Sequence, residues 1–359
     1  FAFAKRYGKR EDEIIDFSSN VNPLGISESM EAEYLDSLQD VSRYPDPYSS
    51  ALGRRIADFF SLAPENVVAG NGSSAILEIA IRALRPERTL VIEPCFSEYR
   101  RFLRLQGSQI LSVRMSPEDD FRFPLKEMVK ALDHVDVLIV GHPNNPTGTA
   151  LLKEEADQLL TQAKRRSVFV VMDEAFVDWM PEISVLPRLK DSSHFLVVRS
   201  MTKFFALAGI RSGFALGPKR WIEKMKDYAG PWDCNLLAQR LSAAALEDSA
   251  FQEKSRLWFQ EERLWFREAL ESLDAFKIFP SSANFFLLQN LKPRAGCFDF
   301  LGKKGIYVRS VMDFAGLDGS YFRISIRMRK ENQFLIEALH EWVNGSRKDP
   351  TEPLVISAY

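Results

Sequence analysis

Between residues 200 and 213 the chain reads SMTKFFALAGIRSG. This run directly follows an apolar stretch, residues 194–199, which predicts a strand buried on both faces. A lysine, Lys203, is thereby placed just past the end of a strand, and Arg211 follows eight residues later. Ligands of parallel sheets bind at the carboxyl ends of the strands. The run therefore predicts both a sheet and a site at the edge of that sheet.

On both sides of this run, short apolar runs alternate with longer amphipathic stretches, from about residue 50 to 240. Strands buried on both faces have such continuous apolar sequences, and helices between them imply parallel pairing. The predicted fold class is therefore α/β, with a large, mostly parallel sheet. The strands are expected at residues 67–69, 89–92, 110–113, 135–140, 168–172, 195–198 and 213–216.

A second, smaller α+β domain is predicted from the change of pattern near residue 276, where short strands precede a final helix. Its strands are expected at residues 283–288, 307–309 and 322–326. The predicted organisation is an N-terminal arm that forms part of the small domain (1–45), a large domain (46–240), a small C-terminal domain (241–345) and a tail (346–359).

Composition narrows the functional classes. The 359 residues carry a formal charge of −2, which gives no reason to expect a nucleic acid or an anionic membrane as partner. No apolar run approaches the roughly 20 residues that span a bilayer, and the first residues lack the apolar core of a signal peptide, so a cytoplasmic location is expected. The three cysteines are scattered and indicate reduced thiols, and the four dispersed histidines predict no metal site.

Polar residues follow three of the predicted strands: Asn145, Asp173 and Lys203. They are separated by 28 and 30 residues, about one strand-helix-strand unit each, so all three are expected at one sheet edge. Pyridoxal 5′-phosphate (PLP) needs these groups: a Schiff-base lysine, a carboxylate beside the pyridine nitrogen and an amide donor to O3′. Each residue alone is better explained as a surface charge, a turn or a helix cap. Together they favour PLP.

The run Gly70 to Ala75, GNGSSA, supplies a phosphate cradle. It follows a strand and opens a helix, so backbone N–H groups and the helix dipole can hold an anion. The same run fits the G-x-G-x-x-A dinucleotide pattern, with Glu93 at the end of the next strand as a ribose-binding acid. A nicotinamide-dependent dehydrogenase is therefore the alternative, but it gives Lys203 and Asn145 no role. The residues expected to hold the PLP phosphate are Gly72, Ser73, Ser74, Ser200, Thr202 and Arg211.

Three further side chains have two possible roles each. Phe96 follows a strand and could stack on the pyridine ring or simply belong to the core. Arg309 and Arg323 border the small-domain strands, where they could bind an anionic substrate through bidentate contacts or form surface ion pairs.

From residue 16 to about 343 the chain resembles the fold-type I PLP-dependent enzymes of the aspartate aminotransferase superfamily. The most similar branch contains histidinol-phosphate aminotransferase and the threonine-phosphate decarboxylase of cobamide biosynthesis, and the decarboxylase is favoured. The motifs that carry the resemblance are DFSSNVNPLG (16–25), PWDCNLLAQ (231–239) and FAGLDGSYFR (314–323).

The resemblance implies a role for each residue that matches a family motif. Lys203 is the Schiff-base lysine, Asp173 the pyridinium partner and Asn145 the O3′ donor. Phe96 stacks on the cofactor, and Tyr44 reaches its phosphate from a neighbouring subunit, which implies a homodimer with shared sites. The residues expected to contact a small phosphorylated amino acid substrate are Asn22, Arg309 and Arg323.

Two positions bear on the choice between the branches. The aminotransferases usually have a tyrosine, whose phenol donates to O3′, where this chain has Phe176. The decarboxylases often carry His-Gly-Gly near their start, where this chain has Arg6 to Arg10 instead. Threonine phosphate is the favoured substrate, while phosphoserine decarboxylation and transamination of histidinol phosphate stay open. A PLP-binding regulator is the non-enzymatic alternative, but no helix-turn-helix pattern is predicted before residue 16.

Overall fold

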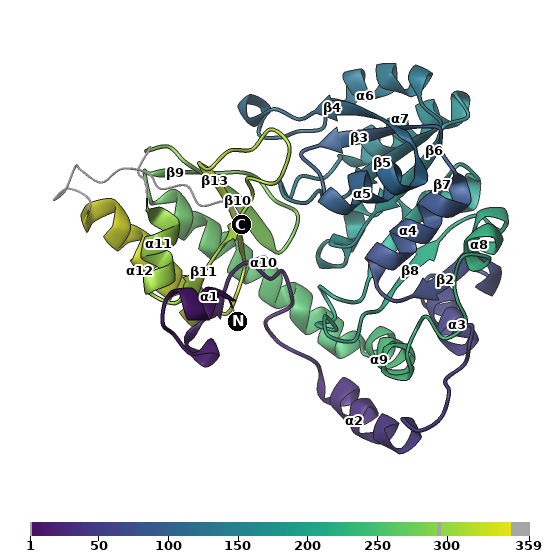
Figure 1. The fold of residues 1–359 in the computed structure, drawn as a ribbon, viewed down its shortest axis with the longest axis horizontal. Helices are drawn as coiled ribbons and strands as arrows, with labels where there is room; N and C mark the ends of the chain where they lie inside the picture. The colour runs from purple at the N-terminus through teal and green to yellow at the C-terminus, as the bar shows by residue number, and fades with distance from the viewer. Residues whose placement is uncertain (1, 293–295, 346–359) are drawn as a thin grey trace.

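A computed structural model describes residues 2–292 and 296–345. Its largest element is a seven-stranded sheet with the strand order β2-β8-β7-β6-β5-β3-β4 (Figure 1). Strand β8 runs antiparallel to both of its neighbours, and the other pairs are parallel. The predicted α/β fold with a mostly parallel sheet is confirmed. The strands are β2 (Val67–Gly70), β3 (Arg88–Glu93), β4 (Gln109–Arg114), β5 (Val137–Gly141), β6 (Phe169–Asp173), β7 (Phe195–Ser200) and β8 (Gly213–Leu216).

Helices cover both faces of this sheet, which explains why its strands are continuously apolar. Successive residues of β6 pack into different cores, because side chains alternate between the faces of a strand. Val171 packs in the core that includes α4, α5 and α8, while Val170 and Met172 pack in the core that includes α3, α6 and α7. These helices are α3 (Ser50–Phe59), α4 (Ser73–Leu84), α5 (Ser97–Gln106), α6 (Leu125–Ala131), α7 (Lys153–Arg165) and α8 (Lys219–Lys226).

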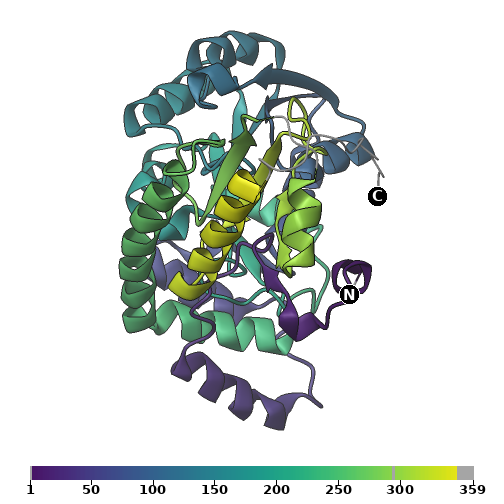
Figure 2. The ribbon, with the colours of Figure 1, turned by 90° about the vertical axis from the view of Figure 1, so that its left-hand side faces the viewer.

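The C-terminal part has an antiparallel sheet of four strands in the order β12-β13-β10-β9. Helices α10 and α12 pack against each other, and Figure 2 shows them side by side in front of this sheet. Its elements are β9 (Phe276–Ile278), β10 (Phe285–Asn290), β12 (Arg309–Ser310), β13 (Tyr321–Ser325), α10 (Ser249–Glu271), α11 (Cys297–Lys303) and α12 (Arg329–Gly345). Helix α9 (Leu236–Glu247), which precedes them, packs against α3 on the large-sheet side.

The N-terminal segment contacts both parts of the molecule. Strand β1 (Ile15–Asp16) pairs in parallel with β11 (Ile306–Tyr307) beside the small sheet. Helix α2 (Glu28–Ser37), which follows the short α1 (Ala2–Arg6), packs instead against α9 (Figure 1). The predicted domain boundaries stay predictions, and the predicted tail, 346–359, lies outside the described residues.

Among the described residues, none of the helices is long and apolar enough to cross a membrane. The cytoplasmic location expected from the sequence stays a prediction.

Candidate active site

A cavity of about 270 Å³ lies where strands β5, β6 and β7 end and helix α4 begins. Parallel strands place their carboxyl ends at one edge, so residues distant in sequence meet there. The small domain and the N-terminal segment close the other side. The lining residues are Ser18, Ser19, Asn20, Ser73, Ser74, Phe96, Ser97, Tyr99, Pro143, Asn145, Asp173, Ala175, Phe176, Ser200, Thr202, Lys203, Arg211, Arg309, Phe314 and Arg323.

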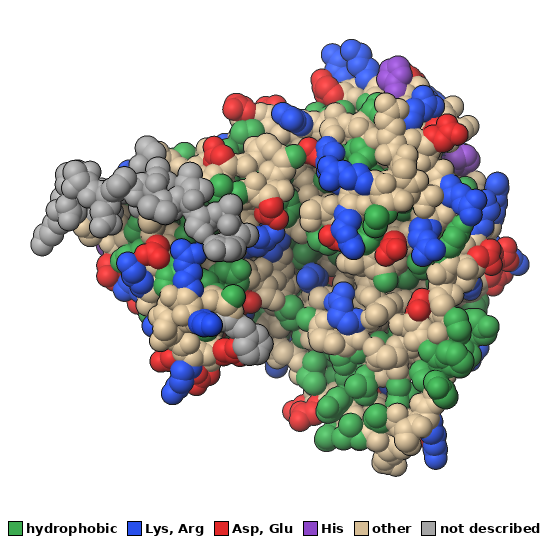
Figure 3. Space-filling view, viewed as in Figure 1, with side chains coloured by type: hydrophobic (Ala, Val, Ile, Leu, Met, Phe, Trp, Pro, Cys, Tyr) green, Lys and Arg blue, Asp and Glu red, His purple; other side chains and the backbone are tan. Residues whose placement is uncertain are grey.

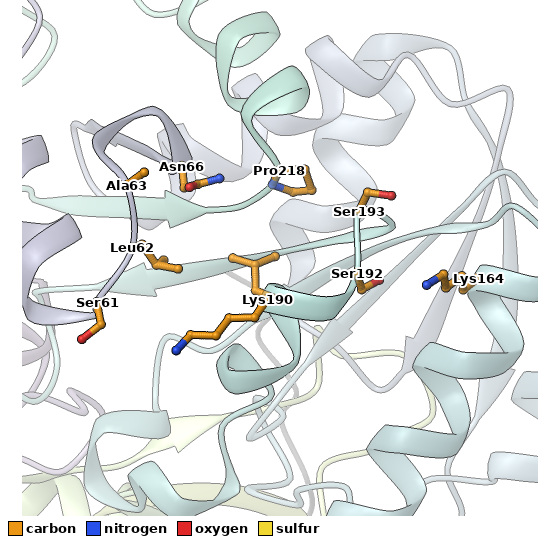
Figure 4. A pocket seen from close by; sticks show the side chains of 10 residues that line it. Ser61, Leu62, Ala63, Asn66, Lys164, Lys190, Ser192, Ser193 and Pro218 are labelled. Atoms are coloured by element: carbon orange, nitrogen blue, oxygen red, sulfur yellow. The ribbon is translucent and has the colours of Figure 1, made fainter.

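A larger and more open cavity, of about 580 Å³, lies elsewhere on the large domain (Figure 4). It is lined mostly by hydroxyl and apolar residues, with Lys164 and Lys190 on different elements. None of the residues predicted from the sequence lines it, and its lining contains no carboxylate and no aromatic ring. The smaller cavity is therefore the candidate active site.

Lys203 lies in the loop after β7, with its Nζ 5.9 Å from the centre of the Phe176 ring. Burial lowers the pKa of Lys203 to about 8, and the guanidinium groups of Arg323 and Arg211 lower it as well, against the opposing effect of Asp173. A lysine with such a pKa has a substantial neutral fraction near physiological pH. The neutral amine is the form that attacks an aldehyde, as the predicted Schiff-base role requires.

Asp173 ends strand β6 and is buried. The Tyr99 hydroxyl donates to its Oδ2 at 2.6 Å, and the Ala175 N–H donates to its Oδ1 at 3.1 Å. Burial raises the pKa of Asp173 to about 6, while the hydrogen bond from Tyr99 acts in the opposite direction. A buried carboxylate with this environment is suited to a cationic partner such as a protonated pyridine nitrogen.

Tyr99 is a site residue that the sequence reasoning missed. It is buried in helix α5, three residues after Phe96, and the two rings are 5.7 Å apart. Residues three apart lie on the same face of a helix. The spacing of three residues from Phe96, the predicted stacking residue, is the one sequence feature that could have indicated Tyr99.

The phosphate cradle depends on two glycines that allow close packing. Gly72 has a φ of +89°, and a Cβ built there would lie 2.6 Å from Arg211 Nη2. A Cβ on Gly213 would lie 2.4 Å from the Ser73 nitrogen at the start of α4. Arg211 and the first turn of α4 thus lie close together, and Arg211 Nη1 is 3.4 Å from the Thr202 hydroxyl. This cluster of donors around a helix N-terminus fits a phosphate group.

Arg323, in the small domain, contacts the N-terminal segment and the loop that follows β5. Its Nη1 donates to Asn145 Oδ1, and its Nη2 donates to the Ser18 carbonyl oxygen at 2.9 Å. With the Asn20 amide oxygen turned toward it, that oxygen lies 3.1 and 3.3 Å from Nη1 and Nη2. The Arg323 Nε is buried without a hydrogen-bond partner. Arg323 also lines the cavity, where a guanidinium group is suited to an anionic ligand.

Arg309 lies directly opposite Arg323 in the antiparallel pair of β12 and β13. It is more exposed than Arg323, and its Nη2 donates to Asp313 at 2.6 Å. Proximity to Arg309 and, above all, burial lower the pKa of Arg323. The two guanidinium groups therefore form a cationic pair on the small-domain side of the cavity.

Three predicted residues, Gly72, Tyr44 and Asn22, are not among those that line the cavity. Tyr44 is 84% exposed, and its ring packs 5.0 Å from that of Trp232. The sequence predicts a substrate contact for Asn22, but in the structure this residue lies outside the cavity lining, and its backbone N–H donates to the Lys203 carbonyl oxygen. Its amide nitrogen donates to the Phe204 carbonyl and to the Ser255 hydroxyl, each at 2.9 Å. Since both amide hydrogens are used within the protein, the predicted substrate contact is corrected to an internal one.

The N-terminal residues Ser18, Ser19 and Asn20 line the cavity but were not predicted to do so. They belong to the motif at residues 16–25, from which only Asn22 was chosen. The motif contains two asparagines, Asn20 and Asn22, and the sequence does not indicate which of the two side chains lines the cavity.

Comparisons with known proteins identify the family of this chain. The model of the family "Aminotransferase class I and II" matches residues 12–339. Threonine-phosphate decarboxylase from Salmonella typhimurium is 31% identical over 340 residues, which cover 94% of this chain and 93% of the relative. Histidinol-phosphate aminotransferase from Methylobacillus flagellatus is 33% identical over 343 residues, or 94% of this chain and 91% of the relative.

The same likeness holds between structures. The crystal structure of histidinol-phosphate aminotransferase from Clostridium acetobutylicum superposes with a TM-score of 0.87 at 31% identity, covering 92% of this chain and all of the other. The predicted resemblance to the two branches is confirmed.

Proposed function

Because the chain belongs to the aminotransferase class I and II family, a family of PLP-dependent enzymes, we propose that it decarboxylates L-threonine O-3-phosphate. The product is (R)-1-aminopropan-2-ol O-2-phosphate, for assembly of the nucleotide loop of cobamides. The observation that carries the choice of reaction is Phe176, which lines the cavity within 5.9 Å of Lys203 Nζ and has no hydroxyl to offer. The similarity to a threonine-phosphate decarboxylase over nearly the whole chain supports the proposal.

The residues at the sheet edge fit PLP in charge and in hydrogen-bonding groups. Lys203 would bind it covalently, Asp173 would pair with its pyridine nitrogen, Asn145 would donate to O3′, and Phe96 would stack on its ring. Gly72, Ser73, Ser74, Ser200, Thr202 and Arg211 would surround its phosphate. When bound, PLP supplies a covalent anchor for the substrate amine and a sink for the electrons released at Cα.

Burial and neighbours differ between the two small-domain arginines, so we assign them different substrate groups. Arg323 is buried and contacts Asn145, the residue that would donate to O3′, and we assign it the substrate carboxylate. Arg309 lies in a more exposed position and pairs with Asp313, and we assign it the substrate phosphate. A phosphate dianion can compete with the Asp313 carboxylate for the Arg309 guanidinium group, because the phosphate carries more charge and more acceptor oxygens.

Decarboxylation requires that the bond from Cα to the carboxylate breaks while the Cα–H bond stays intact. Arg323 would hold the carboxylate in the orientation for cleavage, and the phosphate contact at Arg309 would fix the other end of the substrate. The carboxylate leaves as carbon dioxide, and Cα receives one proton in its place. Lys203, whose pKa burial lowers to about 8, would donate that proton from Nζ.

We also propose that two copies form a dimer with shared sites. The exposed apolar residues near Tyr44 support this, and Figure 3 shows apolar side chains gathered over the α2 and α3 end of the molecule. These exposed residues include Leu35, Leu38, Val41, Tyr44, Tyr48 and Trp232.

The deciding experiment is incubation of the PLP-loaded protein with threonine phosphate, phosphoserine and histidinol phosphate, with and without a keto-acid acceptor. The proposal expects carbon dioxide from threonine phosphate without any acceptor, and the Lys203→Ala variant is the control for uncatalysed release. Carbon dioxide release from phosphoserine alone would mean that phosphoserine, and not threonine phosphate, is the substrate. Amino transfer from histidinol phosphate that depends on the acceptor, without carbon dioxide release, would replace decarboxylation by the alternative function.

A further inference from the structure

Asn22 joins three parts of the chain behind the candidate active site. Its backbone N–H donates to the Lys203 carbonyl oxygen at 2.9 Å. Its side-chain nitrogen donates to the carbonyl of Phe204, the next residue, and to the hydroxyl of Ser255 in helix α10. The Leu24 N–H donates to Asn22 Oδ1 at 3.1 Å, which holds the amide in this orientation. Asn22 is 2% exposed, so water cannot readily replace these bonds.

The segment that carries Asn22 is bonded on its other side to the small domain. The Asn284 side chain donates to the Asn20 carbonyl oxygen at 3.0 Å, two residues before Asn22. Ser325 N–H and hydroxyl both donate to the Phe17 carbonyl oxygen. Residues 17–22 therefore link the small sheet to the backbone of the lysine loop over a short length of chain.

The lysine loop is packed against helix α10 at the same place. The Arg256 guanidinium lies 5.1 Å from the centre of the Phe204 ring, and the neighbouring Ser255 is the residue that accepts from Asn22. Ser255 is completely buried. Phe204 is thus held through its ring by α10 and through its carbonyl by Asn22, which leaves little freedom for the residue that follows Lys203.

We propose that Asn22 is a positioning residue that fixes the backbone at Lys203 and Phe204, so that the Lys203 amine is held where it bonds covalently to PLP. Asn22 acts through the backbone of Lys203 and touches neither cofactor nor substrate. The inference rests on the proposed function only in the role given to Lys203, and it holds for a decarboxylase and an aminotransferase alike.

The test is a double-mutant cycle on the affinity for PLP in the absence of substrate. Asn22→Ser keeps an oxygen that can accept from the Leu24 N–H but is too short to reach Phe204. In the parent protein it should weaken PLP binding about tenfold, because a buried hydrogen bond to the lysine loop is lost. In a Lys203→Ala background, where PLP binds without a covalent bond, the same change should alter affinity by less than about twofold.

Two further variants separate the contacts of Asn22. Ser255→Ala removes the bond to α10 and keeps the bond to Phe204, so it should leave PLP affinity within about twofold of the parent. Asn22→Asp keeps the size of the side chain but removes both donors, and should weaken PLP binding at least as much as Asn22→Ser. Thermal unfolding of each apoprotein establishes that it is folded.

Equal losses of affinity in the Lys203 and Lys203→Ala backgrounds would overturn the proposal, because Asn22 would then support the whole site rather than the lysine. No loss in either background would overturn it as well. If Ser255→Ala weakened PLP binding as much as Asn22→Ser does, the contact of Asn22 with helix α10 would matter, and not its contact with the Phe204 carbonyl. Because no substrate is present, none of these results bears on the choice between decarboxylation and transamination.

Discussion

The two sides of the candidate active site are held in place in different ways. On the large-domain side, Asn145 and Lys203 follow the strands β5 and β7, and Asp173 ends β6 between them. Asp173 is in register with Gly141 on one side and Val198 on the other. On the small-domain side, Arg323 contacts Ser18, which is 305 residues away in the sequence. Sheet register fixes the groups expected to bind the cofactor, whereas contacts between the two ends of the chain place those expected to bind the substrate.

This difference separates two questions about the enzyme. The sheet edge offers the groups that PLP needs, and those groups suit many reactions of the family. The choice of bond to be broken depends on how Arg309 and Arg323 hold the substrate. Substitutions on the two sides should therefore affect different measurements.

The largest effect is expected from Lys203→Ala. Loss of the covalent anchor and of a proton donor should reduce turnover by roughly 10²–10⁴-fold. Borohydride should no longer fix PLP to the protein, while non-covalent PLP binding through the phosphate cradle should persist. Persistence of a borohydride-fixed linkage would show that another lysine anchors PLP, and the large-domain side would then have to be assigned again.

Asp173→Asn should have the next largest effect, about 10²–10³-fold on turnover, because a preorganised charge beside the pyridine nitrogen is removed. The apoprotein should nevertheless be no less stable. The pKa of Asp173 is raised to about 6 in the fold, so the ionised carboxylate is destabilising above the unfolded value of 3.8 and fully so above about 6.

The pH dependence of thermal unfolding checks this sign. The melting temperature of the Asp173→Asn apoprotein relative to the parent should rise between pH 4 and about 6 and then level off. A relative fall over this range would mean that the carboxylate stabilises the empty fold, contrary to its buried environment.

The sheet side could be predicted from the sequence because each of its groups depends on one local pattern, a strand followed by a polar residue. The seven strands and the convergence of Asn145, Asp173 and Lys203 follow from apolar runs and spacing. Tyr99 escaped prediction because its role depends on a hydrogen bond to Asp173, 74 residues away, which no local pattern records.

The small-domain side was predicted less well for a related reason. Arg309 and Arg323, chosen because both border strands, do line the cavity, while their substrate contacts stay predictions. Asn22 was given a substrate contact, although it is Asn20 that lines the cavity. The segment after β1 is irregular, so neither strand nor helix periodicity indicates which of its side chains point outward. Their directions depend on Ser325, Asn284 and Lys203, which lie far away in the sequence.

A smaller effect is expected from conservative changes of the two arginines. Arg323→Lys should lower turnover about tenfold to a hundredfold, since a lysine cannot reproduce the contacts to Asn145 and Ser18 together with one to a carboxylate. Arg309→Lys should mainly raise KM for the phosphorylated substrate. Substrates with and without the phosphate group distinguish the two, because only Arg309→Lys should lose part of the preference for phosphate. A reversed pattern would exchange the carboxylate and phosphate assignments.

Tyr99→Phe should produce the smallest change and the one most dependent on pH. The Tyr99 hydroxyl donates to the Asp173 carboxylate and opposes the effect of burial, so its removal should raise the pKa of Asp173 above about 6. The carboxylate is the form that pairs with a protonated pyridine. PLP affinity should therefore fall as the pH drops through the Asp173 pKa, and this fall should begin at a higher pH in the variant than in the parent.

Titrations of PLP binding from pH 5.5 to 8.5 would measure this displacement. Near the upper end both proteins should bind PLP within about twofold of each other, because Asp173 is ionised in both, and near pH 6.5 the variant should bind several times more weakly. Tyr99→Phe in the Asp173→Asn background is the matched control, and there the variant should show no displacement. A uniform loss of affinity at every pH would instead mean that Tyr99 acts through its packing against Phe96. PLP binding on the large-domain side would then depend more on the shape of the surface against which the ring stacks than on the pKa of Asp173.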